Sequence, residues 1–532
     1  MSALRRWSAL AVLILPVLLI SIDMSVLGIA VPALSADLEP TSSQLLWIID
    51  LYSFLLAGLL ILMGSLGDRY GRRLLLLIGA PAFGLASVMA AFSTSPEMLI
   101  AARALLGLGG ATLMPSTLGL LRTIFPDRKE RRAAIAVWAA AFSGGAALGP
   151  VVGGLLLEHF WWGSVFLVNA PIMVIFLILA IILLPEAKDP NPGPFDLPSA
   201  LLSIAGMLPV VYAFKTLAKD PSLGVSALLP LAGLVAGLTL LVLFVRRQRR
   251  LEHPMIDVGL FTRPGFSAAV LINVIAVFTL LGVMFFFPQY LMLVQGMGSA
   301  QAGLWLLPLA LATIVGSLTS PFVAKVVSVR GVILSGLVLL TAGFVTATRL
   351  DDAETLTTFV LTSLLIGLGV GLAETLTNDV ILTTAPPSRA GAASAISETG
   401  YEFGGAMGTA VLGTVGMAVY ARSLGAADDL AGDLTASQLD GARQTLGAAH
   451  ELADRLPTEV GTVLRDAASD AFVTGMDTVA WVSSVVILST LVIAWRGLRT
   501  QAQDGAEVES TPSPVRAVEE DRIERDRAGV SR

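Results

Sequence analysis

Long apolar stretches, separated by short charged or Pro/Gly-rich breaks, dominate the hydrophobic pattern of this chain. Most stretches hold about the 20 residues that a helix needs to cross a bilayer, and apolar and polar residues do not alternate as in strands. The pattern predicts an all-α integral membrane protein with about fourteen spanning helices. Their expected limits are 9–31, 45–66, 74–92, 98–121, 134–157, 163–185, 197–216, 226–245, 266–288, 301–321, 331–348, 356–383, 391–420 and 473–495.

The composition excludes a soluble globular protein and also a single membrane anchor carrying a large soluble domain. Of 532 residues, 55% are apolar, 51 more are glycine and only 14% are charged, against about 25% charged in soluble proteins. The chain has no cysteine, which rules out disulfides, thiol catalysis and iron–sulfur clusters. The three histidines, His159, His253 and His450, are too scattered for an imidazole metal site, so we expect no metal and no bound cofactor.

The basic residues predict the orientation in the membrane. They cluster in the loops after even-numbered spans and are sparse in the short loops after odd-numbered ones. Because cytoplasmic loops carry the excess of Lys and Arg, both termini are expected in the cytoplasm.

Two segments outside the spans have their own character. The predicted outside loop 421–472 is acidic, and its apolar residues at helical spacing over Leu439–Leu456 predict an exposed helical hairpin. It is either a solvated spacer or an acidic vestibule that concentrates cations. The tail 501–532 is charged and nearly free of aromatic residues, a composition typical of disorder.

Two motifs have a clear physical use. The loop after the second span reads GSLGDRYGRR, in which small residues let helix ends approach and Asp68 can pair with basic groups or cap the next helix. Its key residues are Gly64, Asp68, Arg69, Gly71, Arg72 and Arg73. In the fifth span, Gly145, Gly149 and Gly153 form a stripe at four-residue spacing that permits close helix contact. Pro150 can bend that helix, and Gly154 follows the stripe.

The first motif resembles the signature loop of the major facilitator superfamily, and the second resembles the antiporter motif of its exporters. Arg103 with Gly107, Gly109 and Gly110 is similar to the intramembrane-arginine motif of the fourth span, although Leu106 stands where a glutamine is often found. The segments Leu45–Tyr52, Trp162–Pro171 and Phe287–Tyr290 resemble the fourteen-span drug:proton antiporter subfamily. Within that subfamily, the chain resembles pumps for quaternary ammonium compounds and methyl viologen.

That resemblance implies two six-helix bundles, 1–186 and 263–500, with a two-helix insert and basic loop at 187–262. It implies proton-coupled export of lipophilic cations (quaternary ammonium antiseptics, dyes and viologens) across the inner membrane of a bacterium. The proton gradient would supply the energy, and the partners would be the bilayer, protons and these cations. We expect a monomer that binds no nucleic acid and is not an enzyme.

Ionisable residues inside membrane spans are costly and usually functional. This chain has five such acids and one base: Asp23, Glu374, Asp379, Glu398, Glu402 and Arg103. Glu398 and Glu402 share a helix face about 6 Å apart, so they should titrate as a unit and suit a proton-coupled carrier. Alternatively, the pair faces water or neutralises Arg103.

The remaining residues complete the predicted binding site. Asp23 is expected to bind substrate or proton, or else to make a helix–helix hydrogen bond as a neutral acid. Arg103 is expected to partner an acid. Tyr401 could stack on a flat cation. Glu374 lies deep, whereas Asp379 is expected near the inner end, open to the cytoplasm.

Three other functions fit the sequence less well. An exporter of one dedicated natural product or metabolite could use the same scaffold, but the excess of buried acids favours cations. An ATP-driven pump or a membrane enzyme would need a phosphate-binding loop or a metal cluster, and the sequence has neither motif. A channel would need a pore motif in place of the exporter stripe.

Overall fold

The computed structural model describes residues 2–40, 42–188, 196–219, 228–252, 254–350, 355–386, 390–425 and 434–498. These residues form helices and connecting segments, with no strand among them. The first part of the chain forms α1 (Ala3–Leu38), α2 (Ser42–Tyr70), α3 (Arg72–Ala91), α4 (Pro96–Ile124), α5 (Arg128–His159), α6 (Ser164–Leu167) and α7 (Asn169–Leu183). Several of these helices extend beyond the predicted apolar limits because polar residues continue their ends.

The rest of the chain forms a helix pair and a longer series of helices. The pair is α8 (Leu197–Lys219) and α9 (Leu228–Gln248). The longer series contains η2 (Val258–Thr262), α10 (Pro264–Met284), α11 (Phe287–Gln289), η3 (Tyr290–Val294), α12 (Ser299–Val326), α13 (Val329–Ala347), α14 (Thr355–Thr384), α15 (Ala390–Met407), η5 (Gly408–Leu412), α16 (Gly413–Gly425), α17 (Ala436–Ala442), α18 (Leu446–Arg455) and α19 (Thr458–Gly497).

Polar residues set the helix starts. Ser95 accepts a hydrogen bond from the Met98 backbone N–H at 3.2 Å and begins α4. Asp127 accepts from the backbone N–H groups of Glu130 and Lys129, both at 2.9 Å, and begins α5. These hydrogen bonds hold the pKa of Asp127 below its ordinary value. Ser95 and Asp127 are thus N-caps, which satisfy backbone donors otherwise left unpaired at a helix start.

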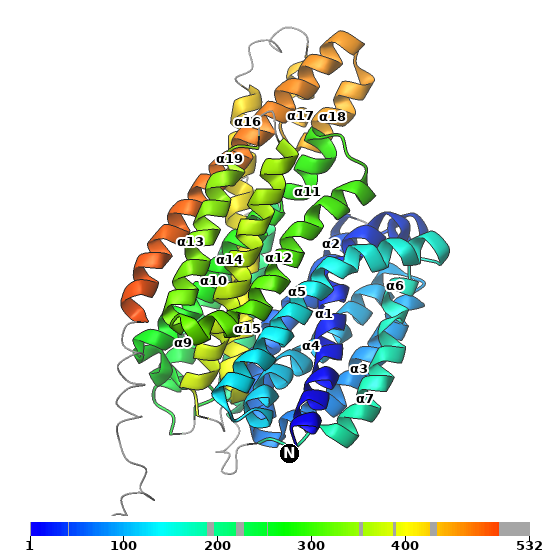
Figure 1. Cartoon of the computed structure of the whole chain (residues 1–532). Coiled ribbons are helices and arrows are strands. Elements are labelled where there is room, and N and C mark those ends of the chain that lie inside the picture. The colour runs from blue at the N-terminus through cyan, green and yellow to red at the C-terminus, as the bar shows by residue number, and fades with distance from the viewer. Residues whose placement is uncertain are drawn as a thin grey trace, which may run out of the picture.

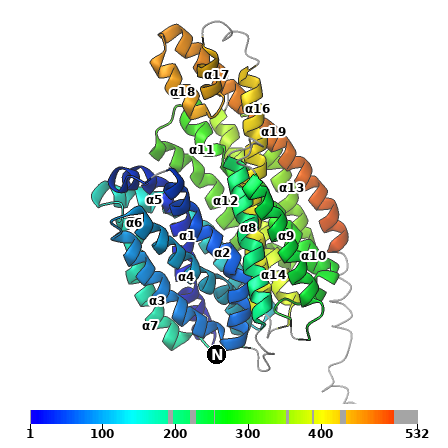
Figure 2. The same ribbon diagram turned by 180° about the vertical axis from the view of Figure 1, so that it is seen from behind.

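Two groups of helices pack side by side. Helices α1 to α7 contact one another, and helices α10 to α19 form a second group. The two groups meet where α5 contacts α12 and α14, and where α2 and α4 contact α15. Figures 1 and 2 show this arrangement from opposite sides. The exact domain boundaries at 186, 262 and 500 stay a prediction.

The pair α8–α9 lies against the outside of this interface. α8 contacts α2, α15 and η5, and it is visible in front of them in Figure 2. Asp196, just before α8, accepts two hydrogen bonds from the Arg247 guanidinium of α9 at 2.8 and 2.9 Å. This contact holds the pKa of Asp196 below its ordinary value. The pair is therefore tied together at one end and attached to both groups.

Eleven helices in the described part of the chain are long and apolar enough to cross a bilayer, or twelve if the bent α5 counts as one span. α8 has only a shorter apolar stretch, Leu197–Val210, and α15 is rich in glycine and carries two glutamates. The count of fourteen spans therefore stays a prediction.

The segment between α16 and α19 forms two short helices at one end of the molecule. α17 and α18 lie beside the first part of α19, and together they project beyond the other helices (Figure 1). α19 begins at Thr458, well before the predicted fourteenth span at 473, because its polar first half continues the same helix. The predicted hairpin covers 421–472, of which residues 426–433 lie outside the described part. The predicted tail 501–532 lies outside it as well.

Candidate functional site

Asp23 and Arg103 form a buried ion pair inside the first group of helices. The Arg103 Nη1 donates to Asp23 Oδ2 at 2.7 Å, and both side chains are 2% exposed or less. The Arg103 Nε also donates to the Ile48 carbonyl at 2.9 Å. The guanidinium carbon lies 4.5 Å from the ring centre of Tyr52, a cation–π geometry. The acid that Arg103 partners is thus Asp23, and the pair joins α1 to α4.

Asn169 supports this pair, and the sequence reasoning gave it no role. From the start of α7 it donates to Asp23 Oδ1 at 3.5 Å and to Ser87 Oγ at 3.3 Å. Its side chain is fully buried. The available signal was a polar amide, two residues before a proline, within a strongly apolar stretch, since buried amides in spans usually bond across helices.

The other predicted acids gather in the second group of helices. Glu398 and Glu402 lie four residues apart on α15, and the charges of Glu374 on α14 and Glu402 both act on Glu398. Glu374 and Glu398 are 9% and 6% exposed. Within the described residues, neither forms an ion pair or a side-chain hydrogen bond. The two groups of helices thus differ: Asp23 is neutralised by a base, whereas these two acids are not.

Aromatic rings lie next to these acids. Tyr401, between the two glutamates of α15, packs edge-to-face on Phe142 of α5 with ring centres 5.2 Å apart. Phe142 stacks in turn on Trp138, with ring centres 6.1 Å apart. The three rings therefore bridge α5 and α15, which belong to different helix groups. Acids beside aromatic rings are the surroundings that lipophilic cations prefer.

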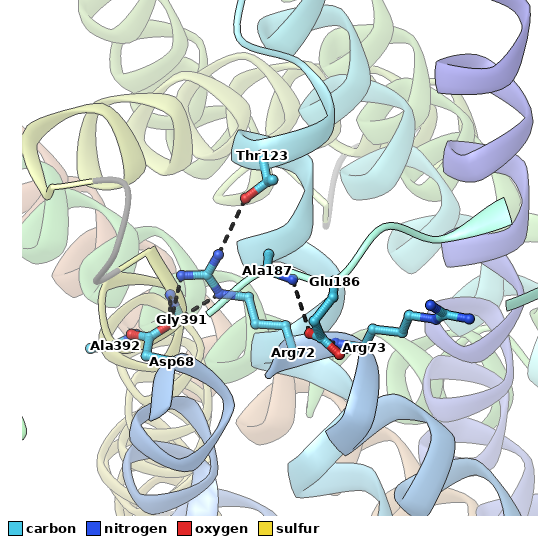
Figure 3. A network of polar contacts seen from close by, with 8 residues as sticks. All are labelled: Asp68, Arg72, Arg73, Thr123, Glu186, Ala187, Gly391 and Ala392. Atoms are coloured by element: carbon cyan, nitrogen blue, oxygen red, sulfur yellow. Dashed lines mark hydrogen bonds and ion pairs between the residues drawn. The ribbon is translucent and has the colours of Figure 1, made fainter. Parts of the chain in front are cut away.

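Asp68 of the signature loop joins the two helix groups (Figure 3). It accepts from Arg72 Nε at 3.0 Å and Nη2 at 2.6 Å. It also accepts from the backbone N–H groups of Gly391 and Ala392 at 2.9 and 2.8 Å. Asp68 thus pairs with a base, as predicted, but the helix that it caps is α15 and not the next helix, α3. A carboxylate is favoured there because a helix start carries positive partial charge.

The glycines of this loop permit close approach. A Cβ on Gly64 would lie 2.7 Å from the Gly391 carbonyl oxygen. Gly71 has φ 122, and a Cβ there would meet the Glu186 carboxyl at 2.5 Å. Glu186, which the sequence reasoning did not single out, accepts from the Arg73 backbone N–H at 3.2 Å (Figure 3). It therefore caps α3 in place of Asp68.

The other two arginines of the loop bind nearby groups. Arg73 Nη2 donates to the Ile181 carbonyl at 2.5 Å. The Arg69 guanidinium lies 5.4 Å from the ring centre of Tyr70. Arg72, the partner of Asp68, also donates to Thr123 at 3.3 Å.

Asp379 does not lie open at the inner end as expected. It is 1% exposed, and it pairs with Arg132 Nε at 2.7 Å and with Arg131 Nε at 3.7 Å. These arginines begin α5, so the contact joins α14 to the first helix group. They cover the carboxylate, which explains its burial.

The glycine stripe of α5 packs on α1. A Cβ on Gly145 would lie 2.8 Å from Ser21 Cβ, and one on Gly153 would lie 2.6 Å from Val26 Cγ2. On Gly149 it would overlap the Ser25 hydroxyl at 1.9 Å, whereas Gly154 has nothing within 4 Å. The segments Arg128–Ala146 and Val151–His159 are bent by 42°, and the break between them contains Pro150.

The family model of the Major Facilitator Superfamily matches residues 13–409. The chain belongs to this family and is a multi-pass membrane protein of a transporter fold.

Two relatives carry names for multidrug efflux and for methyl viologen resistance. The chain is 45% identical to "Multidrug efflux pump LfrA" of Mycolicibacterium smegmatis, covering 92% of this chain and 95% of the relative. It is 37% identical to "Methyl viologen resistance protein SmvA" of Salmonella typhimurium, covering 91% and 95%. The solved structure of the human organic anion transporter MFSD10 (TETRAN) matches with a TM-score of 0.59, at 15% identity over 93% of this chain and all of that chain. This structural likeness concerns the fold alone.

Proposed function

We propose that the protein is a proton-coupled multidrug antiporter that exports lipophilic mono- and divalent cations by alternating access. Its place would be the cytoplasmic membrane of a bacterium, with both termini inside. Relatives named for multidrug efflux and methyl viologen resistance support this class of substrate.

One observation carries the proposal: Glu374 and Glu398 are buried without a basic partner among the described residues, beside Tyr401 and Phe142. A buried carboxyl of this kind can hold a proton in one state and attract a cation in another, which makes proton and drug compete for it. Asp23 has Arg103 as its partner, so we assign it the role of organising the first helix group.

The contacts of Asp68 and Asp379 support alternating access. Both acids join the two helix groups at the face that carries the N-terminus, which the positive-inside rule predicts to be cytoplasmic. Breaking and remaking such contacts while the two groups rock about the site would expose it first to one side and then to the other.

The test uses everted membrane vesicles that are energised to be acid inside and contain a pH-sensitive dye. Ethidium, a benzalkonium cation and methyl viologen are added in turn. We expect each to dissipate the gradient with wild-type protein but not with Glu398→Gln. Glu459→Gln, which alters an exposed acid at the start of α19, is the matched control and should behave as wild type.

Two outcomes would contradict the proposal. No response of wild-type protein to any of the three cations would favour export of a dedicated metabolite on the same fold. A response that Glu398→Gln leaves intact would keep the antiport but remove α15 as its proton site.

A further inference from the structure

A line of buried polar side chains runs between α14 and α15, from the acids toward the predicted cytoplasmic face. On α14 these residues are Glu374, Thr375 and Asn378, and on α15 they are Ser394, Ser397 and Glu398. All six are between 0% and 9% exposed. Within each helix they recur at spacings of three or four, so each set lies on one helix face.

The two faces meet. The Ser397 hydroxyl donates a hydrogen bond to the Asn378 amide oxygen, and the Glu374 charge acts on Glu398. α14 and α15 are consecutive and antiparallel. The step from Glu374 to Asn378 on α14 and the step from Glu398 to Ser394 on α15 therefore both run about 6 Å toward the predicted cytoplasmic face. Asp379, held by Arg132, lies at the far end of this line.

Two hydroxyls in the line have no partner within the described residues. They are Thr375 Oγ1 and Ser394 Oγ, both buried. The Thr377 hydroxyl of α14 bonds instead to its own helix, at the Glu374 carbonyl, over 2.9 Å. Outside the line, Ser363 Oγ and Thr399 Oγ1 are also buried without a partner within the described residues. Leaving a buried hydroxyl unpaired costs about 1–3 kcal/mol, so its persistence calls for a function. Hydroxyls without a fixed bond are free to rotate and to pass a proton on.

We propose that this line is the route by which protons travel between the acids and the cytoplasm, with Glu374 as the relay acid. The proposal rests on the proton coupling proposed above. Glu398 takes up the proton and passes it to Glu374. When the proton leaves Glu374, a hydroxyl of the line accepts it and releases its own proton to the next carrier. Bulk water takes the last proton, and Glu374 remains as a carboxylate. Asn378 is a positioning residue that orients the Ser397 hydroxyl.

The Asp379–Arg132 contact closes the inner end of the route. While it holds, two arginines separate the line from the predicted cytoplasmic face, and their positive charge repels a departing proton. When the two helix groups part at that face, the same movement opens the end of the route. Proton release is thereby confined to the inward-open state, as an antiporter requires.

The experiment measures two kinds of ethidium transport with purified protein in liposomes. Exchange of ethidium for ethidium without a pH gradient needs binding and rocking but no net proton movement. Uptake driven by a pH gradient needs binding and rocking and also net proton movement. The variants are Thr375→Val and Ser394→Ala, which remove the two unpartnered hydroxyls, and Asn378→Leu, which removes the partner of Ser397. Thr377→Val is the control on the same helix, because its hydroxyl bonds to its own helix.

We expect the three variants to keep wild-type exchange and to lose gradient-driven uptake by roughly tenfold or more, as when a proton-transfer group is removed. Thr377→Val should keep both. Equal losses in exchange and uptake would indicate a structural role and overturn the proposal, and so would variants that keep both activities. A wild-type protein that exchanges ethidium but ignores the gradient would overturn proton coupling itself, and the route with it.

Discussion

At the scale of single residues, the Asp23–Arg103 pair gives a direct test of buried charge. Removing one partner of such a pair leaves the other charge uncompensated, at a cost of about 3–5 kcal/mol. We expect Asp23→Asn to lower the melting temperature of the purified protein strongly, because Arg103 then loses its carboxylate and keeps the Ile48 carbonyl and the rings of Tyr52 and Phe166.

The double variant Asp23→Asn, Arg103→Gln separates charge from packing. It should be more stable than Asp23→Asn alone, since no isolated charge remains. Melting curves of the four proteins in the same detergent form the cycle that measures the coupling. Additive losses would show that the two side chains act independently.

The sequence was sufficient to find these charged residues, but not to pair them. Asp23 and Arg103 stand out because an apolar span makes any ionisable group conspicuous. Their pairing, and that of Asp379 with Arg132 across 247 residues, depends on how each helix is rotated about its axis. That rotation is set by packing against helices distant in the sequence, so spacing along the chain could not supply it.

At the scale of helices, the glycine stripe of α5 predicts which substitutions the packing forbids. Gly145→Ala would place a Cβ 2.8 Å from Ser21 Cβ and 2.9 Å from the Leu18 carbonyl oxygen. Neither atom can move by a simple rotamer change, so we expect a loss of about 1–3 kcal/mol from overpacking. Gly154→Ala meets nothing within 4 Å and should be neutral or slightly stabilising, because alanine favours helix.

Thermal unfolding of both variants in detergent measures this difference. If Gly154→Ala destabilised as much as Gly145→Ala, the loss would come from helix flexibility and not from contact with α1. Ethidium efflux by the two variants then tells whether the tight α1–α5 contact is also needed for transport.

A second stripe, which the sequence reasoning missed, lies on α15 and η5. A Cβ on Gly404 would lie 2.4 Å from the Val274 carbonyl oxygen, and one on Gly408 2.0 Å from that of Phe278. Both atoms belong to α10, so α15 packs on α10 as α5 packs on α1. The four-residue spacing of these glycines is visible in the sequence, but the two glutamates on the same helix are the more conspicuous feature because charged residues are rare in a span.

At the scale of the whole molecule, two acids join the helix groups at the same face, one from each group. Asp68 of the first helix group binds the start of α15, and Asp379 of the second group binds arginines at the start of α5. Only the first was predictable, because it lies in a recognisable loop. The second has no motif, yet it is the more buried of the two acids. We infer that the two contacts share the task of holding this face closed.

That sharing predicts how the protein responds when one contact is removed. Because the chain has no cysteine, Ala395→Cys provides a single reporter at a buried position where α15 meets Gly64 of α2. A charged hydrogen bond contributes about 1.5–3 kcal/mol, so Asp379→Asn should raise the rate at which a maleimide labels this cysteine by roughly tenfold. Asp454→Asn, which breaks an exposed ion pair with Arg465 on the outer helices, is the matched control.

Exchanging the two charges completes the argument. In Asp379→Arg combined with Arg132→Asp the ion pair can form again with opposite polarity, so slow labelling should return, while either single change should keep labelling fast. Recovery in the double variant would show that the contact acts through its charge, and that this second contact is needed to keep the face closed while Asp68 is intact. If Asp379→Asn labelled no faster than the parent protein, Asp68 alone would hold the face shut and Asp379 would serve only the packing of α14 on α5.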